Sequence, residues 1–259
     1  MYIKKNSAYI SKKQIFYLSI PVFFANLAIP MAGIIDTALM GNLGEIKFLA
    51  AASIATSFMT MVIWSFGFLR MGTVGIVAQL FGKGDYREIV KTLIRNFLIG
   101  FVIAIIIILS KPILINCINF FFSTSLETQD LIRTYISVRI FSIPAELSLY
   151  ILVGFYLGIQ KTKISSLLII VLSILNIILS LFFVIYLNLD IFGVALGTLL
   201  SSYITLIFFS FFTYNFIIKK FRVIPNLNRI IIKSKILRLF NINFDIFIRT
   251  IFLTFSFLW

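Results

Sequence analysis

The sequence of 259 residues is 61% hydrophobic and only 12% charged, with a mean hydropathy of +1.08. Soluble globular domains are about half apolar and about a quarter charged, so this composition excludes that class and indicates an integral membrane protein. The net charge of +14 does not indicate nucleic-acid binding, because the Lys and Arg residues lie in short segments between apolar stretches.

Six apolar stretches reach the ~20 residues that a helix needs to cross a bilayer. We expect spans at residues 15–41, 48–81, 93–120, 131–159, 164–187 and 191–218. Turn-forming segments such as Gly41-Asn42-Leu43-Gly44 and Gly82-Lys83-Gly84-Asp85 separate them. The sequence therefore predicts an all-α polytopic membrane protein whose residues 15–218 form a six-helix transmembrane bundle.

The distribution of Lys and Arg predicts the orientation of these spans. When the N-terminal residues 1–14 are placed in the cytoplasm, 17 of the 23 basic residues fall in cytoplasmic segments. The outer loops then hold three, Lys47, Lys111 and Arg133. Cytoplasmic loops carry the excess of Lys and Arg in membrane proteins, so we expect a multi-pass protein of the cell (inner) membrane with a cytoplasmic N-terminus.

Two further segments follow the sixth span. Residues 219–243 are basic and partly amphipathic, which predicts a cytoplasmic linker that lies on anionic lipid. Residues 244–259 begin a seventh apolar helix but are too few to cross a bilayer. We expect them to be the truncated first helix of a second lobe.

The first span contains one carboxylate, Asp36, in an otherwise apolar helix. A charged side chain near the centre of a membrane helix costs roughly 3 kcal/mol, so such residues usually have a partner or a function. One interpretation is that Asp36 binds and releases a cation inside a transporter. The other is a static ion pair with Arg139, although Glu146 lies two turns further along the same helix face and competes for that arginine.

Small polar residues of the fifth and sixth spans are predicted at the depth of Asp36. Asn176 and Ser180 are four residues apart and share a helix face, and Thr198 follows a similar distance into the next span. With Asp36 they could supply the oxygens of a cation-coupling site. Hydrogen bonding that merely joins the helices is the alternative, because Ser, Thr and Asn commonly do this in membranes.

The first span also contains Pro21 and Pro30. Proline cannot donate the helix hydrogen bond to the residue four positions earlier, so Pro30 frees the carbonyl of Asn26. Broken helices in transporters place free carbonyls near the substrate path and allow bending. We expect a helix bend here, with Asn26 at the substrate cavity; an inert kink is the alternative.

Aromatic residues could line that cavity through cation–π contacts, and Tyr150, Tyr156 and Tyr203 are the candidates. We find no phosphate-binding loop, no H-E-x-x-H motif and no cysteine pair, since Cys117 is the only cysteine. The sequence therefore predicts neither an enzyme nor a metal site, and no cofactor beyond a coupling ion.

These residues are parts of a pattern that covers nearly the whole chain. Its elements are Ile35-Asp36-Thr37 with Gly41 and Gly44, Phe68-Leu69-Arg70-Met71-Gly72-Thr73, Arg139 with Pro144, Leu175-Asn176, Gly193-Val194-Ala195-Leu196-Gly197-Thr198, and Asp245 with Arg249. In this order they resemble the multidrug and toxic compound extrusion (MATE) transporters, and within them the DinF-like branch.

The resemblance implies a function and a site. Transporters of this family export drug-like or toxic, often cationic, organic compounds in exchange for H+ or Na+. Asp36 matches the coupling carboxylate of their first helix, and Asn176 matches the asparagine of their fifth. Many members carry an aspartate where this chain has Ser180, and relatives often carry histidine where it has Asn42, so the resemblance leaves the coupling ion open between H+ and Na+.

The family has twelve spans in two six-helix lobes, with the substrate path between them. This sequence matches the amino-terminal half, so we expect the chain to be incomplete and inactive alone, with a missing or separately encoded C-terminal lobe as its partner. Two alternatives are a lipid-linked flippase of the same superfamily and a non-transporting remnant or half-transporter subunit.

Overall fold

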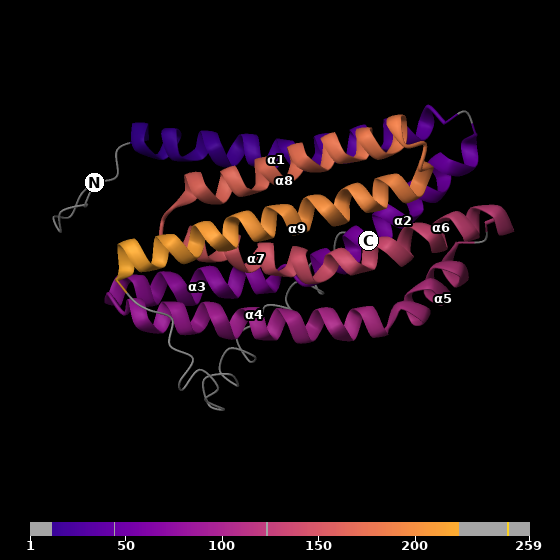
Figure 1. Ribbon diagram of the computed structural model, residues 1–259. Helices are drawn as coiled ribbons and strands as arrows, with labels where there is room; N and C mark the ends of the chain where they lie inside the picture. Colours follow the sequence, from indigo (N-terminus) through magenta and orange to yellow (C-terminus); the bar gives the residue numbers. More distant parts are fainter. Residues whose placement is uncertain (1–11, 44, 123, 223–247, 249–259) are drawn as a thin grey trace.

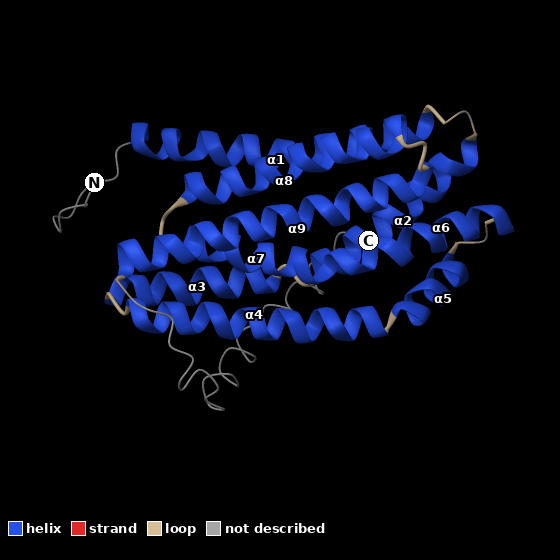
Figure 2. Cartoon of the chain, in the orientation of Figure 1, coloured by secondary structure: helices blue, strands red, loops and turns tan. Residues whose placement is uncertain are grey.

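The structure is a computed structural model that describes residues 12–43, 45–122, 124–222 and 248. Every regular element among these residues is helical, as Figure 2 shows. The elements are α1 (Lys12–Gly41), α2 (Ile46–Ser65), α3 (Phe68–Lys83), α4 (Tyr86–Leu109), α5 (Lys111–Phe121), α6 (Leu126–Arg139), η1 (Ile140–Ser142), α7 (Ile143–Gly158), α8 (Thr162–Leu181), η2 (Phe182–Tyr186), α9 (Asp190–Phe216) and η3 (Ile217–Phe221). The all-α fold is confirmed.

Six of the helical segments in the described part of the chain are long and apolar enough to cross a membrane. They are Ser19–Gly41, Ile46–Lys83, Tyr86–Leu109, Leu126–Gly158, Thr162–Tyr186 and Asp190–Phe221. Each overlaps one predicted span, because an apolar run of this length is a strong signal for a membrane helix.

The second span differs from the continuous helix that we expected. It breaks at Phe66 and Gly67, where α2 ends and α3 begins. Gly67 suits this point because a Cβ on it would come within 3.0 Å of the Trp64 carbonyl oxygen.

The third span is shorter than the predicted 93–120. It ends at Leu109, and a separate helix, α5, begins at Lys111 with Pro112 in its first turn. Proline is favoured there because its missing N–H would have no helical partner. The chain therefore turns at Ser110, and α5 and α6 together extend one end of the bundle (Figure 1).

Long helices lie side by side along the bundle. Helix α1 packs on α8, α8 packs on α9, and α7 packs on α3 (Figure 1). Helix α7 is the most enclosed, with eleven of its sixteen residues buried. The turns α3–α4 and α7–α8 and the end of α9 lie at one end of the bundle, and the turns α1–α2 and α8–α9 lie at the other.

Glycines allow the close contact between α7 and α3. A Cβ on Gly154 would come within 2.7 Å of the Arg70 carbonyl oxygen, and one on Gly158 within 2.7 Å of the Val77 Cβ. Both distances are shorter than van der Waals contact, so any larger residue would force the two helices apart.

Some predicted segments cannot be compared with the structure. The N-terminal segment 1–14, the basic linker 219–243 and the truncated helix 244–259 lie outside the described residues, apart from a few positions at their edges.

Candidate functional site

A cavity of about 230 Å³ is formed by residues of α1, α2, α3, α6, α7, α8 and α9. Its wall combines apolar side chains with an unusual number of polar ones for a membrane bundle. The polar and charged lining residues are Asp36, Thr56, Thr60, Arg70, Tyr135, Arg139, Glu146, Tyr150, Ser173, Asn176, Thr198, Ser201 and Ser202. Because these residues come from most of the spans, packing of the bundle is what assembles the site.

Asp36 lies in the last two turns of α1, where its carboxyl group lines the cavity. Its Oδ1 atom is buried and has no hydrogen-bond partner among the described residues. The Ser180 hydroxyl approaches this carboxyl group, but Ser180 Oγ is likewise buried and makes no hydrogen bond of normal geometry. A buried polar atom left without a partner costs about 1–3 kcal/mol, so two such oxygens together mark a place where a cation could be held.

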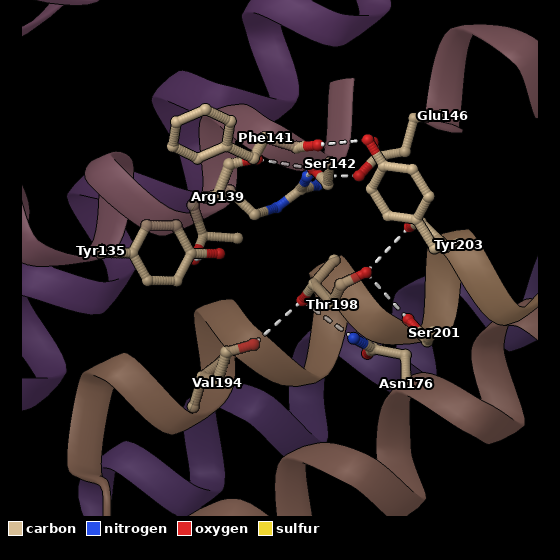
Figure 3. Close-up of polar contacts among 12 residues, drawn as sticks. Tyr135, Arg139, Phe141, Ser142, Glu146, Asn176, Val194, Thr198, Ser201 and Tyr203 are labelled. Carbon is tan, nitrogen blue, oxygen red and sulfur yellow. Dashed lines mark hydrogen bonds and ion pairs between the residues drawn. The ribbon is translucent and has the colours of Figure 1, made fainter. Parts of the chain in front are cut away.

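Asn176 and Thr198 join α8 to α9 beside the same cavity. Asn176 Nδ2 donates to Thr198 Oγ1 at 2.9 Å, and Thr198 Oγ1 donates to the Val194 carbonyl at 3.1 Å (Figure 3). The Thr198 carbonyl accepts hydrogen bonds from the Ser201 and Ser202 hydroxyls at 3.0 and 2.8 Å. These bonds fix the amide and the hydroxyl in one position.

The contact between α8 and α9 is closest where Gly197 meets Ser180. A Cβ on Gly197 would come within 2.8 Å of both the backbone nitrogen and the Oγ of Ser180. The absence of a side chain at Gly197 therefore lets the Ser180 backbone approach α9. Of the three predicted oxygen donors, Ser180 approaches the Asp36 carboxyl group, while Asn176 and Thr198 line the same cavity as Asp36. Among the described residues, no three His, Cys, Asp or Glu side chains gather as a metal cluster.

Arg139 forms its ion pair with Glu146, and its guanidinium also donates to the Ser142 hydroxyl (Figure 3). Ser142 Oγ in turn donates to the Arg139 carbonyl at 2.6 Å. Arg139 ends α6, Ser142 is the last residue of the short helix η1, and Glu146 lies in the first turn of α7. The static Asp36–Arg139 pair is therefore not present, because Glu146 takes the guanidinium.

The other predicted cavity residues divide between two cavities. Tyr150 lines the cavity that contains Asp36. Asn26 lines a second cavity of about 410 Å³, with Arg70 as a shared wall residue. Helix α1 runs through both Pro21 and Pro30 as one element.

Two tyrosines lie away from the cavity that contains Asp36. The Tyr203 hydroxyl donates to the Phe141 carbonyl at 3.0 Å and does not line that cavity. Tyr156 is fully buried, and its hydroxyl bonds with that of Thr213 at 2.7 Å. Tyr156 therefore packs in the helical core and does not line the cavity, a difference that the aromatic composition of the sequence could not predict.

Among the lining residues that the sequence analysis did not select, Arg70 and Tyr135 carry the most informative side chains. Arg70 lies some 22 residues into the predicted second span, which by helix direction alone predicts a position near the opposite membrane face, yet it lines the same cavity as Asp36. Tyr135 lies one turn before Arg139 and is hydrogen-bonded to the Thr56 hydroxyl at 3.2 Å. A charge inside a span was the available signal for Arg70, since such residues are rare and usually functional. For Tyr135 the signal was its four-residue spacing from Arg139.

Comparison with known proteins adds a family match. The model of the MatE family matches residues 21–182. The DNA damage-inducible protein F of Escherichia coli is 31% identical over 200 residues, which are 76% of this chain and 43% of that protein. The multidrug export protein MepA of Staphylococcus saprophyticus is 26% identical over 211 residues, covering 80% of this chain and 46% of the relative.

Solved structures have the same fold. A MOP superfamily transporter from Pyrococcus furiosus superimposes with a TM-score of 0.78 at 21% identity, covering 89% of this chain and 50% of that one. An outward-facing multidrug resistance MATE family transporter gives a TM-score of 0.77 at 21% identity, covering 87% and 49%. The chain thus spans about half the length of these proteins.

Proposed function

The chain belongs to the MatE family of multidrug efflux transporters, and on that premise we propose that it takes part in exporting small organic compounds, often cationic, in exchange for H+ or Na+. The observation that carries the proposal is the Asp36 carboxyl group, whose buried Oδ1 has no partner in the described structure. Transport needs a group whose charge is free to be neutralised by an incoming cation and exposed again when that cation leaves.

In this proposal Asp36 is the coupling carboxylate, and Ser180, Asn176 and Thr198 supply neutral oxygens. A carboxylate alone suffices for a proton, whereas Na+ needs several oxygen ligands to replace its water. Because Ser180 cannot ionise, Asp36 would supply the only negative charge of this group.

Substrate would occupy the cavity beside this site. Its lining combines aromatic and aliphatic side chains with polar groups that converge on the same space, a composition that suits organic molecules. Tyr135 and Tyr150 offer ring faces, while the Arg139–Glu146 pair adds no net charge. We expect binding of the cation to change the affinity for the substrate, because both would lie against the same cavity wall.

The orientation that we propose has the N-terminus in the cytoplasm. At one end of the bundle lie the basic residues of the α3–α4 turn, the α7–α8 turn and the end of α9 (Figure 1). These are Lys83, Arg87, Lys91, Lys161, Lys163, Lys219, Lys220 and Arg222. The other end carries Lys47, Lys111 and Arg133, and the positive-inside rule assigns the richer end to the cytoplasm.

We also propose that a second six-helix lobe completes the substrate path. The structures with the same fold are about twice as long as this chain. Alternating access requires two bodies that rock against each other, so the chain alone should bind but not transport. Co-production with a carboxy-terminal lobe should restore export, and export by the chain alone would contradict this part of the proposal.

The coupling role is tested by Asp36→Asn in the transporter, measured as proton- or sodium-driven movement of ethidium in everted membrane vesicles. We expect loss of cation-driven transport, because asparagine cannot change its charge. Asp130→Asn is the matched control, since Asp130 is exposed at the start of α6 and should leave transport unchanged. Unchanged coupling in Asp36→Asn would contradict the proposal.

A further inference from the structure

Arg70 lies at the boundary of two cavities. It belongs to the first turn of α3, and its half-buried side chain lines both the Asp36 cavity and the second cavity. Its guanidinium lies over the Tyr150 ring, with the central carbon 5.8 Å from the ring centroid. A ring contact occupies one face of the guanidinium and leaves its in-plane N–H groups available to an acceptor.

The charges around the cavity leave Arg70 without a counterion. Four charged side chains line the wall, and two of them, Arg139 and Glu146, form an ion pair with each other. Among the residues that the structure describes, neither Arg70 nor Asp36 lies within 4.0 Å of an opposite charge. Arg70 is therefore the cavity cation whose charge is not already neutralised.

An unpaired guanidinium inside a membrane span is rare and marks a binding site or a substrate path. Its planar fork of N–H donors matches the oxygens of a carboxylate or a phosphate, which it binds with two parallel hydrogen bonds. Around it the wall is apolar and aromatic, with Trp64, Val153 and Ile169 among its members. Such a wall fits the body of an organic molecule, and Arg70 fits its acidic group.

We propose that the cavity binds organic molecules that carry an anionic group, and that Arg70 holds this group. The inference rests on the proposed function, in which this cavity receives the substrate. It differs from that proposal in the charge of the substrate, because a compound held by Arg70 carries an anionic group although the compounds exported by the family are often cationic. A free organic anion and a lipid with an anionic headgroup offer the same chemistry to Arg70, so the experiment must separate these two sources.

The chain itself supplies the reporter for a binding experiment. Trp64 lines the cavity, and the second of the two tryptophans, Trp259, lies outside the described residues. In a Trp259→Phe background, energy transfer from Trp64 to a dansyl group reports binding at the cavity. The probes are dansylglycine, which is anionic, its neutral methyl ester, and cationic dansyl-ethylenediamine, all titrated into the purified chain in neutral phosphatidylcholine nanodiscs.

We expect dansylglycine to bind roughly tenfold more tightly than its methyl ester, since a hydrogen-bonded charge pair contributes about that factor. Arg70→Gln should remove this preference, and Arg70→Lys should keep part of it because it keeps the charge but loses the fork. Arg133→Gln is the matched control, because Arg133 is exposed on α6. If Arg70→Gln does not fold, the graded loss in Arg70→Lys still reports the role of Arg70.

Each outcome has one meaning. Any one of four results would overturn the inference. Two concern the probes: equal affinity for dansylglycine and its ester, or tightest binding of the cationic probe. The other two are the absence of energy transfer and equal losses of affinity in Arg70→Gln and Arg133→Gln. None of these bears on cation coupling by Asp36, which the transport experiment tests separately. If the preference for dansylglycine over its ester disappears in nanodiscs containing phosphatidylglycerol, the natural anionic group comes from lipid. If the preference persists, the source is a soluble organic anion. Both results support Arg70 as the binding group.

Discussion

The first and fourth spans of this lobe differ in how the rest of the protein surrounds them. In α1, 11% of the residues in its most apolar window are buried, against 67% in the α6–α7 span. Both spans carry a carboxylate at the same cavity, but Glu146 on α7 forms an ion pair with Arg139, whereas Asp36 on α1 forms no ion pair with a described residue and its buried Oδ1 has no hydrogen-bond partner among them. The enclosed span thus has a neutralised charge that stabilises it, and the peripheral span has one left available to a ligand.

The largest expected effect is on the enclosed span. Glu146→Gln leaves the Arg139 guanidinium buried without its counterion, which typically costs about 3–5 kcal/mol. We expect a clearly lower midpoint of thermal unfolding in detergent. Glu127→Gln is the matched control: its ion pair with Lys47 is exposed and screened by solvent, so its loss should change the midpoint little. Equal effects of the two substitutions would remove the distinction between the spans.

The glycines of the two spans give the next contrast. Gly154→Ala places a Cβ 2.7 Å from the Arg70 carbonyl oxygen, so we expect a loss of about 1–3 kcal/mol as α3 and α7 separate. On α1, Gly33 has no neighbour within 4 Å of a new Cβ. Gly33→Ala should therefore be neutral or gain up to about 1 kcal/mol from helix propensity. Thermal unfolding of both variants tests the difference, and a cost at Gly33 as large as at Gly154 would contradict it.

A smaller effect is expected where α8 meets α9. Asn176→Ala removes the hydrogen bond to Thr198 and should cost about 1 kcal/mol. Thr37→Ala is the control on α1, because the Thr37 hydroxyl bonds only to the Gly33 carbonyl of its own helix at 2.8 Å. It should change stability little, as measured in the same unfolding series. A loss in Thr37→Ala that matched the loss in Asn176→Ala would show that the interhelical bond is not what matters.

The smallest effect, with the opposite sign, is expected at Asp36. Asp36→Asn removes a carboxylate that no described group pairs, so we expect unchanged stability or a gain of about 1 kcal/mol. The unfolding midpoint should stay or rise even though coupling is lost. A fall comparable with that of Glu146→Gln would mean that Asp36 has a structural partner, and the comparison between the spans would fail.

The sequence predicted much of the fold because hydrophobic length and turn residues are local signals. The six spans follow from them, and Lys111-Pro112 is a turn signal at the break after Ser110, while the break at Gly67 lies within a continuing apolar run. At the site, helix direction and spacing predicted that Asn176 and Thr198 share a depth, and the structure joins them by a hydrogen bond. The shared face of Arg139 and Glu146 likewise anticipated their ion pair.

Helix direction and residue spacing could not predict that Arg70 lines the cavity. Depth was counted along one continuous helix, which separates Arg70 from Asp36 by most of the membrane. The cavity is elongated: along the second span its lining runs from Thr56 in α2 to Arg70 in α3, which is about 21 Å at 1.5 Å per residue. A cavity of that length reaches both residues, and only the packing of all the helices determines its extent.

The contact between Gly197 and Ser180 has a consequence for movement. A Cβ on Gly197 would lie 2.8 Å from the Ser180 backbone nitrogen, so the backbones of α8 and α9 are in direct contact at this point. Neither helix has space to slide or rotate past the other there. They would therefore act as a single rigid block during any transition of the lobe. The other wall of the cavity, α1, carries Gly33 and Gly41 with open space around both. A change of shape that opens or closes the pocket would then move α8 and α9 together.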